Sequence, residues 1–212
     1  MNVKELIELL RTAQTPEEVD ARRDEIKELI PQVEPMFDYD QKSKLQVNDL
    51  WIHSVRTALN LPKDIEDDWI YFAALLHDVA KPRCQGPHKK GKDDDMHYYG
   101  HDKLGEEIVK TEIIPMLESK GEVFTEKEKA AILYYVGQHH AQPKLTARRF
   151  IRRQMYKATL DQIENLFTMQ IADAKAQMNC PENRMWVSTN EFLIRRVKKF
   201  CEPGFMAFEW YV

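Results

Sequence analysis

The chain has 212 residues, of which 43% are hydrophobic and 31% charged, a composition typical of one globular domain with a proper core. A formal net charge of −4 excludes a global positive field for nucleic acid, so any basic site has to be local. The three cysteines form no CxxC pair and no disulfide framework, which favours a cytoplasmic location. The longest apolar run, Trp69 to Leu76, is too short to cross a bilayer, and the acidic N-terminus is unlike a signal peptide, so we expect no membrane partner.

Helical spacing of apolar residues predicts an all-α, single-domain helical bundle. The first helix covers residues 3–10, and a second begins at Pro16, with Thr15 as N-cap and Glu18 closing a capping box, and runs to about residue 30. Residues 31–46 are expected to be irregular, residues 82–96 to form a loop, and no strand is expected. The remaining helices are expected over about 48–61, from 63 or 64 to 78, 100–116, 126–140, 160–177 and 188–200.

Histidines and two aspartates occupy inward-facing positions of these predicted helices. His77 lies seven residues after Ile70 and so shares the buried face of its helix. Asp173 lies seven residues after Leu166, between two alanines that leave room for a partner. The full set is His53, His77, Asp78, His101, His139, His140 and Asp173.

Each of these positions, taken singly, also has an ordinary structural explanation. A lone inward histidine is more often a hydrogen-bonded core residue, and Asp173 can cap a helix or pair with an arginine. His139 and His140 can act as imidazolium groups at a helix C-terminus. The collective set is harder to explain by packing, and its imidazole and carboxylate groups, without a thiolate, suit Mn, Fe, Co, Ni or Zn.

The order of these residues resembles the HD-domain metal-dependent phosphohydrolases, whose pattern is a histidine, an adjacent His-Asp pair and a later aspartate in a helical bundle. The matches are His53 in DLWIHSVR, His77-Asp78 in LLHDVAKP and Asp173 in IADAKAQ. The closest resemblance is to the HD domain attached to bacterial CCA-adding tRNA nucleotidyltransferases, through YDQ, AALLHDVAKP, HYYGHDKLG and IRRQM. Ala80 replaces the glycine of the commoner HD-x-GKP. We expect no nucleotidyltransferase domain, since no strand-borne carboxylate pair is present.

The resemblance implies a centre of one or two divalent transition-metal ions. His53, His77, Asp78 and Asp173 would hold the first ion. Asp78, His101 and either His139 or His140 would hold the second, with His139 preferred. Asp78 and Lys81 are the predicted catalytic residues, Lys81 donating to a phosphate or to a carboxylate that contacts the metal ligands rather than the metal. A cation at a helix C-terminus is the ordinary explanation of Lys81.

Basic residues are the candidates for substrate binding. Arg149 and Arg152, with Arg148 and Arg153, lie on one side of a helix or turn, where guanidinium groups suit phosphate. A solvated face that pairs with acidic residues explains them equally well. Lys81, Arg56 and His140 are further predicted substrate contacts. His97 and Asp102 are candidates to orient metal ligands; Trp51, Tyr98 and Tyr99 are candidates to stack on a base, and the loop with Lys89, Lys90 and Lys92 is a candidate lid.

The resemblance predicts an N-terminal helical appendage over 1–35, an HD domain over 36–180, and a C-terminal helix with an aromatic tail over 181–212 packed on the domain. It implies hydrolysis of phosphoesters of nucleotides or RNA ends, by a phosphatase or 2′,3′-cyclic phosphodiesterase that uses a metal-activated water. Two alternatives stay open. One is an HD-type di-iron oxygenase with the same ligands, and the other is a non-catalytic module that binds RNA through its arginines and holds a structural metal.

Overall fold

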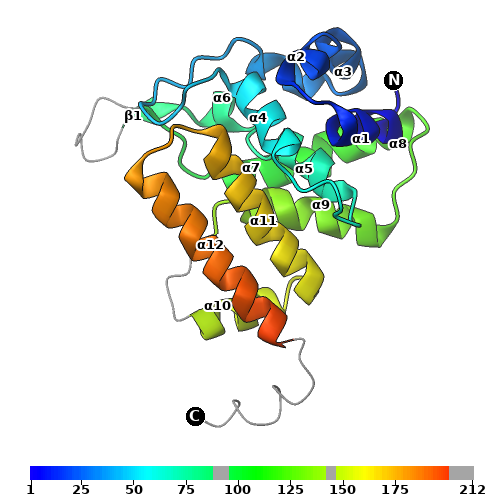
Figure 1. Ribbon diagram of the computed structural model, residues 1–212. Helices are drawn as coiled ribbons and strands as arrows, with labels where there is room; N and C mark the ends of the chain where they lie inside the picture. Colours follow the sequence, from blue (N-terminus) through cyan, green and yellow to red (C-terminus); the bar gives the residue numbers. More distant parts are fainter. Residues whose placement is uncertain (88–95, 142–146, 201–212) are drawn as a thin grey trace.

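A computed structural model describes residues 1–87, 96–141 and 147–200 of the chain (Figure 1). The described residues are almost entirely helical, which confirms the all-α prediction. In chain order the elements are α1 Val3–Thr12, α2 Pro16–Asp20, α3 Arg23–Leu29, a 3₁₀ helix Pro31–Met36, α4 Leu50–Leu59, α5 Trp69–Leu76, α6 Lys81–Cys84, β1 Gly86–Pro87, β2 Met96–His97, α7 His101–Ile108, a π-helix Val109–Ile113, α8 Ile114–Ser119, α9 Glu126–Gln138, α10 Ala147–Gln154, α11 Leu160–Ala176 and α12 Pro181–Phe200.

Helix α5 lies at the centre of the bundle. Its residues from Ile70 to Leu76 are all buried, and α1, α4, α9 and α11 all contact it. A helix that is apolar on every side has to be surrounded by other elements, because no face of it suits water. This central helix carries the His77-Asp78 pair at its C-terminal end.

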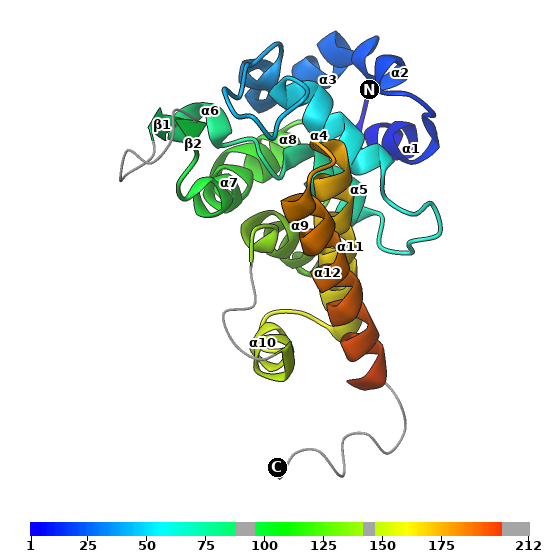
Figure 2. The same ribbon diagram turned by 60° about the vertical axis from the view of Figure 1, so that its left-hand side comes forward.

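The N-terminal helices cover one side of the core. A capping box between Asn2 and Glu5 starts α1, whose buried stripe packs on α4 and α5. In Figures 1 and 2 the α1–α3 segment lies beside α4, and α11 and α12 run side by side as an antiparallel pair. The predicted boundaries of the three segments, 1–35, 36–180 and 181–212, stay predictions. The aromatic tail lies outside the described residues.

Two predictions about the N-terminal half were wrong. The helix expected from residue 16 to about 30 is broken at Ala21 and Arg22 into α2 and α3. Thr15 is the N-cap of α2, but its side chain makes no capping bond; Glu18 instead accepts from the backbone N–H of Gln14 at 3.3 Å. The irregular segment that was expected from residue 31 begins with a 3₁₀ helix.

Local hydrogen bonds and prolines explain other differences. The helix expected from residue 63 or 64 begins at Trp69, where the Asp67 side chain accepts the Trp69 N–H at 3.2 Å and so satisfies a donor of the first turn. The helix expected over 100–116 contains a π-helical turn just before Pro115. Proline lacks an N–H and its ring crowds the preceding turn, so the regular α-helical bond pattern cannot continue there. Helix α12 begins at Pro181, seven residues before the predicted start, and proline suits the first turn of a helix.

The absence of strands was also predicted wrongly. Gly86–Pro87 pairs with Met96–His97 in a two-residue antiparallel ladder (Figure 2). Two residues are too few for alternating hydrophobicity to show in a sequence. The predicted lid residues Lys89, Lys90 and Lys92 lie outside the described residues. No helix in the described part of the chain is long and apolar enough to span a membrane.

Gly100, the N-cap residue just before α7, has a φ of +80°, in the left-handed region that side chains with a Cβ disfavour. Gly100→Ala should lower the free energy of unfolding by about 1 kcal/mol, measured by urea titration. Gly86→Ala is the control, because an added Cβ at Gly86 would meet only open space. Equal effects of the two substitutions would contradict this account of Gly100.

Candidate metal centre

Six predicted metal ligands converge on the interior of the bundle from five helices. His53 lies on α4, the His77-Asp78 pair directly follows α5, His101 begins α7, His139 directly follows α9, and Asp173 lies on α11. All six residues are buried. Core packing therefore brings together side chains that are up to 120 positions apart in the sequence.

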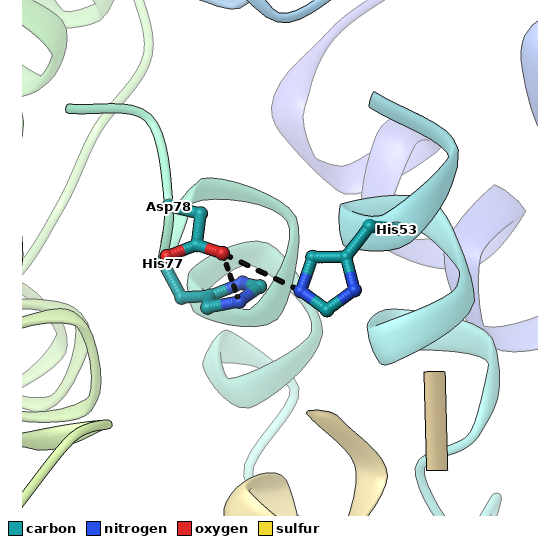
Figure 3. A group of neighbouring side chains, drawn as sticks. All are labelled: His53, His77 and Asp78. Atoms are coloured by element: carbon teal, nitrogen blue, oxygen red, sulfur yellow. Dashed lines mark ion pairs between the residues drawn. The ribbon is translucent and has the colours of Figure 1, made fainter. Parts of the chain in front are cut away.

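The first group lies between α4 and the end of α5 (Figure 3). His53 Nε2 lies 3.4 Å and His77 Nε2 3.1 Å from the same oxygen, Asp78 Oδ2. Asp173 Oδ1 approaches from α11, 3.1 Å from His53 Nε2 and 3.9 Å from His77 Nε2. Four potential ligand atoms thus surround one small volume.

The second group uses the other oxygen of the same aspartate. Asp78 Oδ1 lies 3.3 Å from His101 Nε2 and 3.6 Å from His139 Nε2. In each group of three, His53-His77-Asp78 and Asp78-His101-His139, the ligand atoms lie within 4.8 Å of one another. Asp78 therefore presents one oxygen to each group.

Helix ends set the tautomers of two of these histidines. His77 Nδ1 lies 2.7 Å from the Ala74 carbonyl oxygen, and His139 Nδ1 lies 2.7 Å from the Val136 carbonyl oxygen. These carbonyls belong to the last turns of α5 and α9, where carbonyl groups have no partner within the helix. A carbonyl oxygen can only accept a hydrogen bond, so each Nδ1 carries a proton. In the neutral imidazole the lone pair is then on Nε2, and this nitrogen faces Asp78.

His101 has the same arrangement, with Nδ1 2.6 Å from the Tyr98 carbonyl oxygen. Its Nε2 lies 3.1 Å from His139 Nε2. Two neutral imidazoles in these tautomers would point their lone pairs at each other and at a carboxylate. A positive ion between them removes that repulsion, which is how metal-ligating histidines are usually arranged.

Several of these buried atoms have no hydrogen-bond partner. They include His53 Nε2, His77 Nε2 and Asp78 Oδ1. A buried polar atom without a partner costs free energy, and such atoms are rare in folded proteins. Three of them facing one volume fit a divalent metal ion that imidazole and carboxylate groups would coordinate.

Protonation equilibria in the site favour cation binding. Burial opposes ionisation of Asp78, yet His77, Lys81 and the other histidines hold its pKa well below the usual value. Burial also opposes ionisation of Asp173, and the neighbouring His53 nevertheless lowers its pKa. Burial lowers the pKa of His139 and so favours its neutral form. Both carboxylates are therefore charged at neutral pH.

Lys81, a predicted catalytic and substrate-binding residue, is buried beside the centre rather than open to solvent. Its Nζ lies 2.6 Å from Asp78 Oδ2 and donates to Gln41 Oε1 at 2.9 Å. This ammonium group partly neutralises the shared carboxylate. The structure thus places Lys81 against Asp78, itself a predicted metal ligand, and the contact of Lys81 with a phosphate or with a carboxylate outside the ligand set stays a prediction.

His140 lies at the exposed edge of the centre. Its ring centroid is 5.1 Å from that of His101, whereas His139 is the histidine that approaches Asp78. Arg56 is exposed on α4, and Arg149 and Arg152 are exposed on α10, away from the buried Phe150. The structure does not bring these three arginines into the metal-ligand cluster, and their contact with substrate stays a prediction.

One of the aromatic predictions has a clear outcome. Trp51 is 1% exposed and donates to Asp20 at 2.9 Å, so it is a core residue and the prediction that it stacks on a base was wrong. His97 stacks on the exposed Tyr99, with ring centroids 5.6 Å apart. Asp102 lies in the first turn of α7, where an acidic side chain suits the helix dipole.

Sequence reasoning missed two buried glutamines beside the centre. Gln41 accepts a hydrogen bond from Lys81. Gln170 donates to the Ala141 carbonyl at 3.1 Å, just beyond His139 and His140. Gln41 lies in an irregular segment without periodicity, so no pattern marked it as buried; Gln170 lies one turn before Asp173, a spacing that could have indicated it.

Comparison with protein families identifies the chain. The model of the HD domain matches residues 50–178, more than half of the chain, and includes all six converging residues. The chain belongs to the HD-domain family, whose members form a superfamily of metal-dependent phosphohydrolases. Its helical bundle is the fold expected of that family. No curated protein matches the sequence.

The neighbouring histidines provide a test of the second ligand group. His139→Ala should weaken Mn²⁺ binding to metal-free protein by at least about 10-fold in calorimetric titration, because it removes an Nε2 that faces Asp78. His140→Ala should change the affinity by less than about 3-fold, because His140 lies outside the cluster. The reverse order would show that His140 is the ligand.

Metal affinity should fall as the pH is lowered. Burial opposes protonation of His53 and His101, but nearby carboxylates outweigh it. Asp173 and Asp78 raise the pKa of His53, and Asp78 raises the pKa of His101. A metal ion has to displace those protons, so binding should release about one or two protons near neutral pH and weaken below it. Titrations in buffers of different ionisation enthalpy measure this number, and binding without proton release would contradict the assignment.

Proposed function

We propose that the protein hydrolyses phosphoesters of nucleotides or RNA ends, as a phosphatase or a 2′,3′-cyclic phosphodiesterase. The observation that carries this proposal is the position of Asp78, whose two oxygens face two separate histidine groups. Such a bridging carboxylate suits a pair of divalent ions. Bound there, divalent ions supply an activated water and neutralise phosphoryl oxygens.

The protein's own groups have distinct roles in this proposal. The carboxylates of Asp78 and Asp173 and the four histidine Nε2 atoms would hold the ions. Lys81 stays against Asp78 and limits the negative charge that a phosphate would meet. His140, at the exposed edge beside His101, is a proposed substrate contact. Arg56, Arg149 and Arg152 are the proposed further contacts with phosphate groups.

The substrate class rests on the motifs that resemble the HD domains of CCA-adding tRNA nucleotidyltransferases, especially HYYGHDKLG and IRRQM. The arginines exposed on α10 support a phosphorylated substrate, since guanidinium groups bind phosphate in two-pronged contacts. Nucleotides and RNA ends carry such phosphates.

A phosphoester panel tests this function. Metal-free protein supplied with Mn²⁺, Co²⁺, Ni²⁺ or Zn²⁺ should release phosphate from nucleoside monophosphates or open 2′,3′-cyclic nucleotides. Asp78→Asn should reduce turnover by about 100-fold or more, because it removes charge from the oxygens shared by both groups. Asp161→Asn, at an exposed position in the first turn of α11, is the matched control and should retain turnover within about 3-fold. No turnover on any phosphoester with any metal would refute the proposal.

The same panel separates the two alternatives. A di-iron oxygenase would bind iron and change its visible absorption when oxygen is added, with no release of phosphate. A non-catalytic RNA-binding module would bind RNA equally well after Asp78→Asn and turn over no phosphoester.

A further inference from the structure

A buried side chain from an irregular segment contacts the candidate centre through Lys81. Gln41 is 1% exposed and lies in the 38–48 segment, which crosses the bundle between the 3₁₀ helix and α4. Its Oε1 accepts a hydrogen bond from Lys81 Nζ at 2.9 Å. Gln41 is 40 positions from Lys81 in the sequence, so this contact exists only in the folded protein.

The ammonium group of Lys81 has three N–H donors, and three groups of the protein lie around it. Asp78 Oδ2 lies at 2.6 Å, Gln41 Oε1 at 2.9 Å, and the Tyr98 ring centroid at 5.4 Å, within the range of a cation–π contact. Lys81 itself is 7% exposed. Gln41 is therefore the neutral oxygen acceptor that holds this buried cation beside Asp78.

The backbone of the segment holds Gln41 in place. The Gln41 carbonyl accepts from the Tyr98 hydroxyl at 2.5 Å, and its side-chain amide donates to Gln46 Oε1 at 3.2 Å. Lys42, the next residue, has a φ of +46°, an uncommon conformation for a residue with a side chain. The Lys42 carbonyl accepts from the Met96 N–H at 3.0 Å, which ties the segment to β2.

We propose that Gln41 is a positioning residue that fixes Lys81, and through Lys81 the Asp78 carboxylate, in the orientation that presents one oxygen to each group of histidines. The inference rests on the proposed metal centre and adds a residue that lies before the part of the chain matched by the HD-domain model. Without Gln41 Oε1, a buried ammonium donor lacks an acceptor, and Lys81 and Asp78 have to rearrange together. The binding site is then less well preorganised for a metal ion.

Calorimetric titration of metal-free, full-length protein with Mn²⁺ tests this role. Gln41→Met keeps the length of the side chain but removes the acceptor, and should weaken binding about 10-fold. Gln41→Glu keeps an acceptor oxygen and should bind within about 3-fold of the unchanged protein. Gln154→Met is the matched control, because it removes the side-chain oxygen of another buried glutamine, which accepts from the Tyr134 hydroxyl at 3.2 Å and not from Lys81, and it should bind within about 2-fold.

A double-mutant cycle asks whether Gln41 acts through Lys81. In a Lys81→Met background, Gln41→Met should cause no further loss of affinity. The same loss in both backgrounds, or an equal loss from Gln154→Met, would show a merely structural role and overturn the inference. If Gln41→Met does not fold, as judged by far-ultraviolet circular dichroism, Gln41→Asn replaces it, since the shorter side chain withdraws the same oxygen.

The outcomes separate this inference from the proposed function. Wild-type affinity in Gln41→Met refutes the positioning role and leaves the metal centre standing. If Gln41→Met weakens binding only when Lys81 is present, but no phosphoester is turned over, the proposed hydrolase activity is refuted and the positioning role of Gln41 stands. If the unchanged protein binds no Mn²⁺, the metal centre and the role of Gln41 both fall.

Discussion

The buried carboxylate of Asp78 is the constraint on which the rest of the site depends. A carboxylate at 2% exposure is costly unless positive charge or hydrogen-bond donors surround it. Lys81 provides one positive charge at 2.6 Å. At His77, His101 and His139 a carbonyl group accepts from Nδ1, so in the neutral imidazole Nε2 presents a lone pair to Asp78 and not a donor. The arrangement is most favourable when a cation occupies the space between these groups.

The bundle makes this arrangement possible by placing the ends of helices at the same point. His77 and His139 follow the last turns of α5 and α9, and each uses a carbonyl of that turn to orient its ring. The same hydrogen bond thus gives a last-turn carbonyl a partner and directs the imidazole Nε2 inward. Because α5 is the most buried helix, the His77-Asp78 pair can shift little, which suits a site that needs fixed geometry.

The elements around the centre contribute unequally. Helices α4, α5, α7, α9 and α11 carry the predicted ligands, and the segment 38–48 contributes Gln41 from outside the matched domain. The N-terminal helices pack on α4 and α5 and so support two of the ligand-bearing elements from behind. An irregular segment can direct a buried polar side chain at an angle that a regular helix face does not offer, at the cost of a backbone conformation such as that of Lys42.

The sequence by itself determined the class of fold, the family and the set of potential ligands, because helical periodicity and the order of His53, His77-Asp78, His101 and Asp173 are local or collinear properties of the chain. Only the tertiary structure shows which of His139 and His140 approaches Asp78, since the turn after α9 brings the His139 ring to that carboxylate. It also decided that Trp51 is a core residue, and it revealed Gln41 beside Lys81. Contacts between positions 40 residues apart leave no periodic trace in a single sequence, because they depend on how packed helices bring an irregular segment over the site.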